Sequence, residues 1–329
     1  MSKKIFMEKR TIKWGIIGLG KIANKFATDL ATIEHAELVA VASRSQENAN
    51  DFAKKYNAEK AYNSYEALAK DVEVDAVYIA TPHSFHKEHA ILCLQNKKAV
   101  LCEKPFAMNL QDVSEMIAVA KENDTLLMEA LWTYFLPHFN FVLEIIQQEK
   151  FGKLQELKAD FGFYTPYNTD SRVFKKEVGG GSLLDIGIYP IFAALSTLGK
   201  PKNIEAEATF FKNGADSSCS MIFEYENSKA YLKSTLLEET PTEAIFTFDD
   251  AIVKINTQFH EPSNVTIIKD GKQETIDFGY NTIGYNYETE HFNQLIRENK
   301  KESTIMTFEF SKSLMNTLDD VRKVIGLEY

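Results

Sequence analysis

The sequence contains little cysteine, glycine and proline, and it has no long uninterrupted apolar run. Three cysteines (Cys93, Cys102 and Cys219) are too few and too scattered for a disulfide framework or a zinc site, and an odd number fits reduced thiols in a cytoplasm. With 15 glycines and 8 prolines in 329 residues, long disordered segments are not expected. The most apolar stretch, 126–146, is interrupted by charged residues and Pro137, so it does not predict a membrane span.

The balance of charge excludes further classes of protein. Lys and Arg number 37 against 47 Asp and Glu, and the resulting net charge of −10 argues against a nucleic-acid partner. The amino terminus, MSKKIFMEKRTIKW, has no apolar segment of the signal-peptide type. We therefore expect a cytoplasmic protein with neither membrane nor nucleic-acid partners.

The first 128 residues alternate short apolar runs with segments of helical periodicity, which is typical of βα units in a doubly wound parallel sheet. The predicted strands are Ile12–Ile17, Leu38–Ala42, Ala76–Ala80, Ala99–Cys102 and Thr125–Glu129. The predicted helices are Lys21–Thr32, Gln46–Tyr56, Ser64–Lys70, Phe85–Asn96 and Asn109–Glu122. This alternation predicts a Rossmann-type domain over residues 1–128.

The rest of the chain, 129–329, has a different rhythm. Helical patterns cover His138–Lys150 and Ser182–Leu198, and a strand is predicted at Gln155–Tyr164. Several further strand-like runs lie within 204–278. Two helical patterns, Tyr287–Glu298 and Phe310–Val324, close the chain. Strand runs followed by helices predict an α+β domain with a large, mainly antiparallel sheet. Too little helix remains to cover both faces of that sheet, so we expect a homodimer or higher homo-oligomer formed through it.

A glycine-rich turn follows the first predicted strand. Gly18 would allow a tight turn, Gly20 would let a pyrophosphate approach the backbone, and Ala23 would let helix and strand pack closely. The sequence G-x-G-x-x-A also occurs in purely structural turns. At the head of a βαβ unit, we interpret it as a dinucleotide-binding turn.

The end of the second predicted strand bears on the choice of cofactor. Ser43 and Arg44 occupy the place where an acidic residue would bind the ribose of NAD, and no acid occurs until Glu47. An arginine there can pair with a 2′-phosphate, stack on adenine or simply be solvated. We favour NADP over NAD.

Two further segments carry groups suited to proton transfer. Lys104, in Glu103-Lys104-Pro105, follows a strand whose carboxyl end should face the ligand crevice, although a solvated loop lysine would fit equally well. After Gly179-Gly180-Gly181, a helix capped by Ser182 would place Asp185 and Tyr189 on one face. The second pattern also fits an amphipathic helix in which a buried tyrosine is hydrogen-bonded to an aspartate and neither residue has a catalytic role.

Taken together, these motifs resemble those of the Gfo/Idh/MocA family of oxidoreductases over nearly the whole chain. Tyrosine at position 189, Glu129-Ala130-Leu131-Trp132-Thr133 and the run Cys93–Pro105 resemble its branch of dihydrodiol dehydrogenases, D-xylose dehydrogenases and glucose–fructose oxidoreductases. The resemblance implies that Lys104 and Tyr189 are the catalytic pair, supported by Asp185. It also implies a substrate pocket lined by Trp132, Phe163 and Arg172.

The cofactor would then contact four parts of the chain. The residues are Gly18, Gly20, Lys21 and Ile22 of the turn, Ser43 and Arg44, and Thr81, Pro82, His83, His86, Glu103 and Lys104. The spacing of His83, His86 and His89 does not suit a metal, and no metal site is expected. Tyr134 stands where many relatives carry arginine, which leaves the natural substrate open.

The activity implied is hydride transfer between NADP and a hydroxyl-bearing carbon of a sugar or related diol, with Tyr189 as general acid or base. An inositol or amino-sugar dehydrogenase is one alternative. A non-catalytic NADP-sensing regulator of the same fold is another, because fold alone does not determine function.

Overall fold

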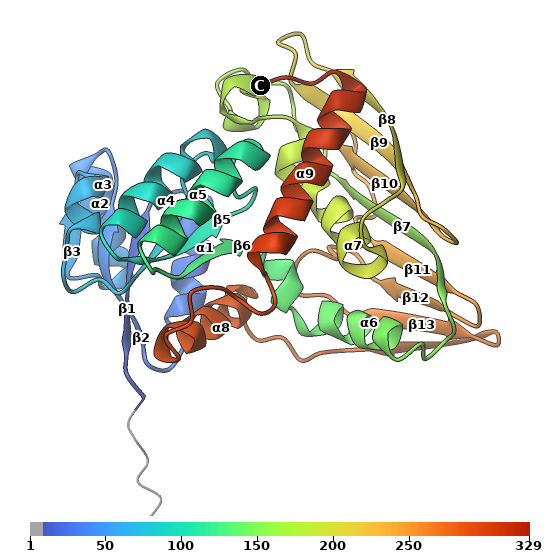
Figure 1. Ribbon diagram of the computed structural model, residues 1–329, viewed down its shortest axis with the longest axis horizontal. Helices are drawn as coiled ribbons and strands as arrows, with labels where there is room; N and C mark the ends of the chain where they lie inside the picture. Colours follow the sequence, from blue (N-terminus) through green and yellow to red (C-terminus); the bar gives the residue numbers. More distant parts are fainter. Residues whose placement is uncertain (1–8) are drawn as a thin grey trace, which may run out of the picture.

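The computed structural model describes residues 9–329, so the prediction about a signal peptide concerns a segment, MSKKIFMEKRTIKW, that lies partly outside the described residues. Two sheets stand side by side, with helices between them (Figure 1). Their inner side chains merge in one hydrophobic core, which includes Trp14, Phe139 and Phe246. The protein thus combines the parallel α/β and the mainly antiparallel α+β architectures that the sequence predicted.

The first sheet is a six-stranded parallel sheet of order β3-β2-β1-β4-β5-β6. Its strands are β1 (Ile12–Ile17), β2 (Ala36–Ala42), β3 (Lys60–Tyr62), β4 (Ala76–Ile79), β5 (Ala99–Glu103) and β6 (Leu127–Ala130). The helices between them are α1 (Lys21–Leu30), α2 (Gln46–Tyr56), α3 (Tyr65–Ala69), α4 (His86–Gln95) and α5 (Leu110–Glu122). Strands β1, β4 and β5 are apolar nearly throughout because helices cover both faces of the sheet.

The second sheet has eight strands in the order β14-β13-β12-β11-β7-β10-β9-β8, and only β7 and β10 pair in parallel. Its strands are β7 (Leu154–Gly162), β8 (Asn203–Phe210), β9 (Asp216–Glu224), β10 (Lys229–Thr235), β11 (Ala244–Phe248), β12 (Ile252–Ile255), β13 (Val265–Lys269) and β14 (Lys272–Ile276). The helices of this half are α6 (Pro137–Gln147), α7 (Ile188–Leu198), α8 (Tyr285–Arg297) and α9 (Phe308–Ile325). Helices α6, α7 and α9 lie on the side of the sheet that faces the parallel sheet (Figure 1).

Helix α8 returns to the first sheet. The buried carboxylate of Asp29, in α1, accepts hydrogen bonds from the backbone N–H groups of Ile283, Gly284 and Tyr285 at 2.8–3.0 Å, and so caps the amino end of α8. The carboxy-terminal part of the chain therefore contributes helices to both layers. A division into domains at residue 128 stays a prediction.

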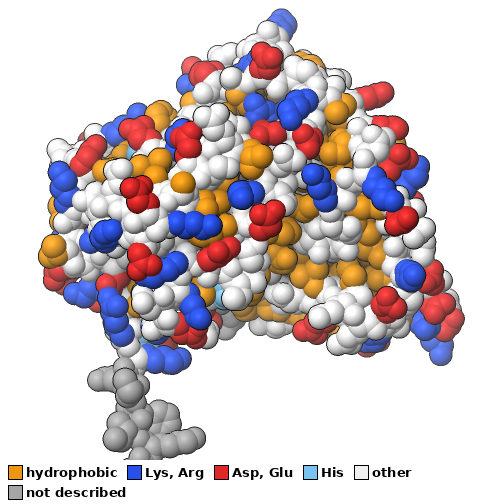
Figure 2. Space-filling model, viewed as in Figure 1, with side chains coloured by type: hydrophobic (Ala, Val, Ile, Leu, Met, Phe, Trp, Pro, Cys, Tyr) orange, Lys and Arg blue, Asp and Glu red, His pale blue; other side chains and the backbone are white. Residues whose placement is uncertain are grey.

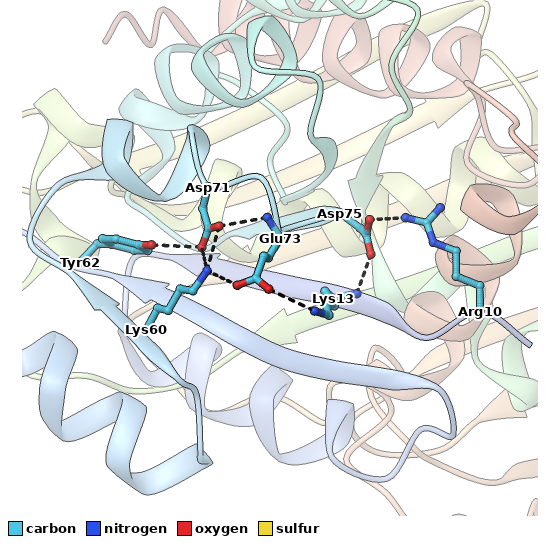
Figure 3. A network of polar contacts seen from close by, with 7 residues as sticks. All are labelled: Arg10, Lys13, Lys60, Tyr62, Asp71, Glu73 and Asp75. Atoms are coloured by element: carbon cyan, nitrogen blue, oxygen red, sulfur yellow. Dashed lines mark hydrogen bonds and ion pairs between the residues drawn. The ribbon is translucent and has the colours of Figure 1, made fainter.

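At the amino ends of the parallel strands, a polar network ties neighbouring segments together (Figure 3). The ammonium of Lys60 contacts both oxygens of Asp71, at 3.0 and 2.9 Å, and also Glu73. Asp75 accepts the backbone N–H of Lys13 at 3.0 Å and pairs with Arg10. Each carboxylate of this network is paired with a cation, so the network is structural.

Candidate active site

A cavity of about 680 Å³ lies at the carboxyl ends of the parallel strands, where α7 and the loops of the second sheet face them. Ligands of open α/β sheets bind at this edge. Of the predicted cofactor, catalytic and pocket residues, all but Phe163 line the cavity. They are Gly18, Gly20, Lys21, Ile22, Ser43, Arg44, Thr81, Pro82, His83, His86, Glu103, Lys104, Trp132, Arg172, Asp185 and Tyr189.

The glycine turn has the geometry that a phosphate-binding turn needs. Gly18 adopts a φ of +86°, and a Cβ there would lie 2.8 Å from the backbone of Ala80, so no other residue fits without strain. Gly20 has open space in front of it, because no atom lies within 4 Å of the place that a Cβ would occupy. Lys21 and Lys25 line the same wall. Open space, free N–H groups at the start of α1 and nearby cations fit the pyrophosphate of a dinucleotide.

Ser43 and Arg44 follow β2 directly and line the cavity beside this turn. Arg44 is exposed, and its charge reaches Tyr65 and His89. Burial lowers the pKa of His89, and the charge of Arg44 adds to that effect. Ser45 caps α2 by accepting the N–H of Asn48 at 3.3 Å, so the loop that presents Arg44 has a fixed end. A cation held at this place suits a 2′-phosphate.

The loop after β4 contributes two histidines with different roles. The ring nitrogens of His86 lie 2.9 Å from the carbonyl oxygen of Pro105 and 2.8 Å from that of Thr81. His86 therefore joins this loop to the segment after Lys104, whose bond to Pro105 is cis. Burial lowers the pKa of His86 to about 4, so the ring is neutral and donates to only one of the two carbonyls.

His83, earlier in the same loop, contacts Arg172 and Asp185. Its Nε2 accepts a hydrogen bond from Arg172 at 3.1 Å and lies 3.7 Å from Asp185 Oδ1. Burial, reinforced by the charge of Arg172, holds the pKa of His83 well below its usual value. The ring is therefore a neutral acceptor that orients Arg172.

Lys104, Asp185 and Tyr189 meet at the centre of the cavity. The Lys104 ammonium donates to the backbone carbonyl of Asp185 at 2.6 Å, lies 3.8 Å from its carboxylate and 4.8 Å from the centroid of the Tyr189 ring. The Tyr189 hydroxyl accepts a hydrogen bond from Trp132 Nε1 at 3.1 Å. Arg172 Nη2 contacts Asp185 Oδ1 at 3.3 Å.

The helix that carries Asp185 and Tyr189 does not begin as predicted. Leu183–Gly187 form a π-turn, and α7 starts only at Ile188. Ser182 is not an amino-terminal cap, because its backbone is already helical and its hydroxyl donates to Asp216 at 2.8 Å. Pro190, the fifth residue after Asp185, has no N–H group and cannot donate a π-helical hydrogen bond to the Asp185 carbonyl. The ammonium of Lys104 donates to that carbonyl instead.

Burial and charge set the protonation of these groups. Burial raises the pKa of Tyr189 well above 10, and Glu103 adds to the rise. Burial alone would also raise the pKa of Asp185, but Arg172 and Lys104 outweigh it and hold that pKa below its usual value. Burial lowers the pKa of Lys104, against the opposing charges of Asp185 and Glu103. The site thus contains a desolvated lysine that lies beside both an ionised carboxylate and a protonated phenol.

One predicted pocket residue, Phe163, does not line the cavity. Strand β7 ends at Gly162, and Phe163 packs instead in a small separate cluster with Phe174, Ile186 and Leu236. Phe161, two residues earlier, lines the cavity and lies 5.7 Å from Tyr189 between ring centroids. The predicted strand contained both residues, but its end at Gly162 was not placed correctly.

Sequence reasoning also missed His260, Glu261 and Tyr285, which line the cavity from the loop after β12 and the start of α8. Tyr285 stacks on Trp132 with ring centroids 4.4 Å apart. No short motif marks these positions. Tyr134, in contrast, lies outside the cavity among Phe139, Phe192 and Phe310.

The structure also bears on metal binding and membrane insertion. Within 9–329, no three His, Cys, Asp or Glu side chains lie close enough together to hold a metal ion.

The segment Lys176–Leu198 is long and apolar enough to cross a membrane, but 94% of its apolar window is buried inside the protein. This segment includes the π-turn and α7, which are part of the protein core. On the face seen in Figure 2, acidic and basic side chains are intermixed.

Comparison with known proteins agrees with this geometry. Residues 12–131 match the oxidoreductase family with an NAD-binding Rossmann fold, and residues 139–263 match the GFO/IDH/MocA C-terminal domain. The chain belongs to the Gfo/Idh/MocA family and is an oxidoreductase, which confirms the resemblance seen in its motifs.

Several relatives are similar over almost their whole length. The trans-1,2-dihydrobenzene-1,2-diol dehydrogenase of Xenopus laevis is 36% identical, covering 96% of this chain and 99% of the relative. The NADP(+) scyllo-inositol 2-dehydrogenase of Bacillus subtilis is also 36% identical, covering 97% and 98%. Among solved structures, the 3-ketoreductase KijD10 of Actinomadura kijaniata, in complex with NADP and TDP-benzene, has a TM-score of 0.86 at 25% identity, covering 96% and 98%.

Proposed function

We propose that this protein is an NADP-dependent dehydrogenase that transfers hydride between the nicotinamide and a hydroxyl-bearing carbon of a sugar, polyol or related diol. The observation that carries the proposal is the meeting of Lys104, Asp185 and Tyr189 in the cavity that also contains the glycine turn and Arg44. Relatives named for NADP, inositol and dihydrodiol chemistry support the same class of reaction.

Bound NADP would supply the hydride acceptor or donor, and the protein's own residues position the substrate and move the proton. In the direction of carbonyl reduction, Tyr189 holds its proton because burial raises its pKa, and its hydroxyl can donate that proton to the substrate oxygen. In the direction of alcohol oxidation, the phenol must first lose its proton. The Lys104 ammonium beside the ring is the group that stabilises the phenolate formed.

Asp185 and Arg172 complete the assignment. The Asp185 carboxylate faces both Lys104 and Arg172, so it fixes the lysine and can accept a hydrogen bond from a second substrate hydroxyl. Trp132 holds the Tyr189 hydroxyl in place. The three buried, free cysteines fit a cytoplasmic protein, and we place the enzyme there.

The test is a panel of aldoses, inositols, deoxyketoses and trans-dihydrodiols, assayed for reduction of NADP and NAD in parallel. Steady NADPH formation with at least one hydroxylated substrate is the expected result. Tight NADPH binding without turnover on any substrate would contradict the proposal and favour a cofactor-sensing regulator.

A further inference from the structure

His260 is held rigidly in the wall of the cavity. It lies in the loop between β12 and β13, where its carbonyl accepts a hydrogen bond from the Thr133 hydroxyl at 2.7 Å. The N–H of the preceding residue, Phe259, donates to the carbonyl of Thr242 at 3.0 Å. The residue is 7% exposed, and it lines the cavity.

The surroundings of the imidazole are aromatic. Its ring centroid lies 4.1 Å from that of Phe161, 4.8 Å from that of Tyr189 and 6.4 Å from that of Trp132. These rings form an apolar wall beside the phenol. The imidazole places a hydrogen-bonding group in that wall, next to the reacting position.

The hydrogen bonds of this ring are not satisfied within the described chain. Neither ring nitrogen forms a hydrogen bond within the described residues. Nδ1 is fully buried without a partner, although more than about 90% of buried polar groups have one, so Nε2 is the ring nitrogen that can meet a ligand in the cavity. Burial, with Lys104 adding to its effect, holds the pKa of His260 well below 6.5, so the ring is neutral. A neutral imidazole has one donor and one acceptor, as a hydroxyl group does.

We infer that His260 hydrogen-bonds a substrate hydroxyl other than the reacting one, and that the substrate is a polyhydroxylated ring. This inference rests on the proposed function. The reacting oxygen is engaged by Tyr189 and Lys104, so a group that reaches His260 from the same molecule is a further substituent. In a diol on an apolar ring, Asp185 takes the second hydroxyl, and no further hydroxyl remains for His260. The imidazole stays unpaired, which disfavours binding of such a diol.

The experiment compares substrates that differ in hydroxyl content. Scyllo-inositol and D-xylose serve as polyhydroxylated probes, and trans-1,2-dihydrobenzene-1,2-diol serves as the apolar-ring probe. The variants are His260→Phe, which keeps an aromatic ring in the wall, and His260→Gln, whose amide reaches close to the position of Nε2. His291→Phe is the control, because His291 bonds Ser303 and does not line the cavity.

For His260→Phe, KM for the polyhydroxylated probe should rise about tenfold with a much smaller change in kcat, because an uncharged hydrogen bond is lost. Turnover of the dihydrodiol should be unchanged or improved. His260→Gln should retain most of the preference for the polyhydroxylated probe, and the control should behave like the wild type.

The outcomes distinguish failure of the inference from failure of the proposed function. If the wild type oxidises a polyhydroxylated probe and His260→Phe does so with the same KM, the inference is wrong and the proposed function stands. Equal losses on all probes would assign His260 a structural role and also overturn the inference. A wild type without turnover across the whole substrate panel would overturn the proposed function, and the inference with it.

Discussion

Tyr189 shows how one residue can be tuned by its packing. Phe161 and His260 flank its ring, Trp132 donates to its oxygen, and the Lys104 ammonium lies near its face. Burial raises the pKa and favours the protonated phenol, whereas the lysine favours the phenolate. The balance between these effects allows one hydroxyl to serve as acid in reduction and as base in oxidation.

Replacing Tyr189 with phenylalanine tests that role with little change in packing. We expect Tyr189→Phe to lower kcat by about 10²–10⁴, the usual contribution of a general acid or base. NADPH binding, measured by fluorescence titration, should stay within a few-fold of the wild type. Tyr164→Phe, at a position that is 61% exposed and does not line the cavity, is the control. A Tyr189→Phe variant with half of the wild-type activity would contradict the assignment.

Arg44 decides the choice of cofactor if it pairs with the 2′-phosphate. We expect Arg44→Ala to raise KM for NADP by roughly tenfold or more, because charge-assisted hydrogen bonds contribute about 1.5–3 kcal/mol. KM for NAD should hardly change. Lys54→Ala removes an exposed charge from α2 and provides the control. If both constants rise together, Arg44 stacks on adenine instead.

Glu129 makes stability depend on pH. It is 1% exposed in β6, and its Oε1 accepts the backbone N–H of Phe106 at 3.0 Å. Burial raises its pKa from 4.5 to about 7. The folded state therefore favours the protonated acid, and the associated stability is complete below pH 4.5 and lost as the pH rises through about 7.

Glu129→Gln removes this titration. From about pH 5 to about pH 8, its free energy of unfolding should rise relative to the wild type by as much as about 3 kcal/mol. Urea unfolding at several pH values measures the difference. Glu122→Gln, at an exposed position of α5, should show no such trend. A difference independent of pH would mean that Glu129 is ionised in the folded protein.

At the scale of elements, the π-turn is held in place by a buried carboxylate. Asp216 Oδ2 accepts the N–H of Leu183 at 2.7 Å and the hydroxyl of Ser182 at 2.8 Å. Gly181 has a φ of +127°, and a Cβ at this position would collide with Asp216 Oδ1. The glycine therefore permits the contact that fixes the start of the turn carrying Asp185.

Gly181→Ala should disturb this contact. We expect a loss of about 1–3 kcal/mol in the free energy of unfolding, together with a fall in kcat as Asp185 shifts. Gly199→Ala is a matched control, because Gly199 also has a positive φ of +76° but has no atom within 4 Å of a Cβ. Equal destabilisation by the two substitutions, with kcat unchanged, would show that the collision is without consequence.

Sequence patterns predicted best the elements whose side chains are buried to the same degree along their whole length. Strands β1 and β5 are buried on both faces, so continuous apolar runs located them closely. Lys104 and the glycine turn were located from motifs at strand ends. This worked because the parallel topology brings the carboxyl ends of the strands together on one side of the domain.

The π-turn could not be predicted, because the spacing of Asp185 and Tyr189 fits an α-helix equally well. The contact that holds the start of this turn comes from Asp216, which lies 34 residues beyond Ser182. His260 comes from a loop with no motif, and only tertiary packing brings its ring to Tyr189. Phe163 was misplaced for a related reason, because the end of β7 depends on pairing with β10 and β11.

At the scale of the whole molecule, one face of the second sheet has no cover. Helices α6, α7 and α9 pack on the inner face, and within the described chain no helix lies on the other (Figure 1). On β10 the side chains of Ala230 and Leu232 are buried, whereas Tyr231 between them is 37% exposed. Ile252 and Ile268, paired across β12 and β13, are exposed to the same extent.

We propose that this outer face forms a two-fold dimer. A two-fold axis brings the same surface of both copies together, so a mixed surface of apolar and oppositely charged side chains can pair with itself. The outer face has this composition: Lys158 lies opposite Tyr231 in the sheet, and Glu205 and Glu207 stand on β8. Burying the apolar residues supplies the driving force, and the charges set the register.

Light scattering at micromolar concentration should therefore give twice the mass of the chain. Tyr231→Lys, which puts a further positive charge beside Lys158 and Lys233, should shift the protein toward the monomer because like charges would face each other across the axis. Val72→Lys, at a position 92% exposed on the other half of the molecule, should leave the dimer intact. A monomeric wild type would rule out this interface, and dissociation by both variants would point to an unspecific effect of charge.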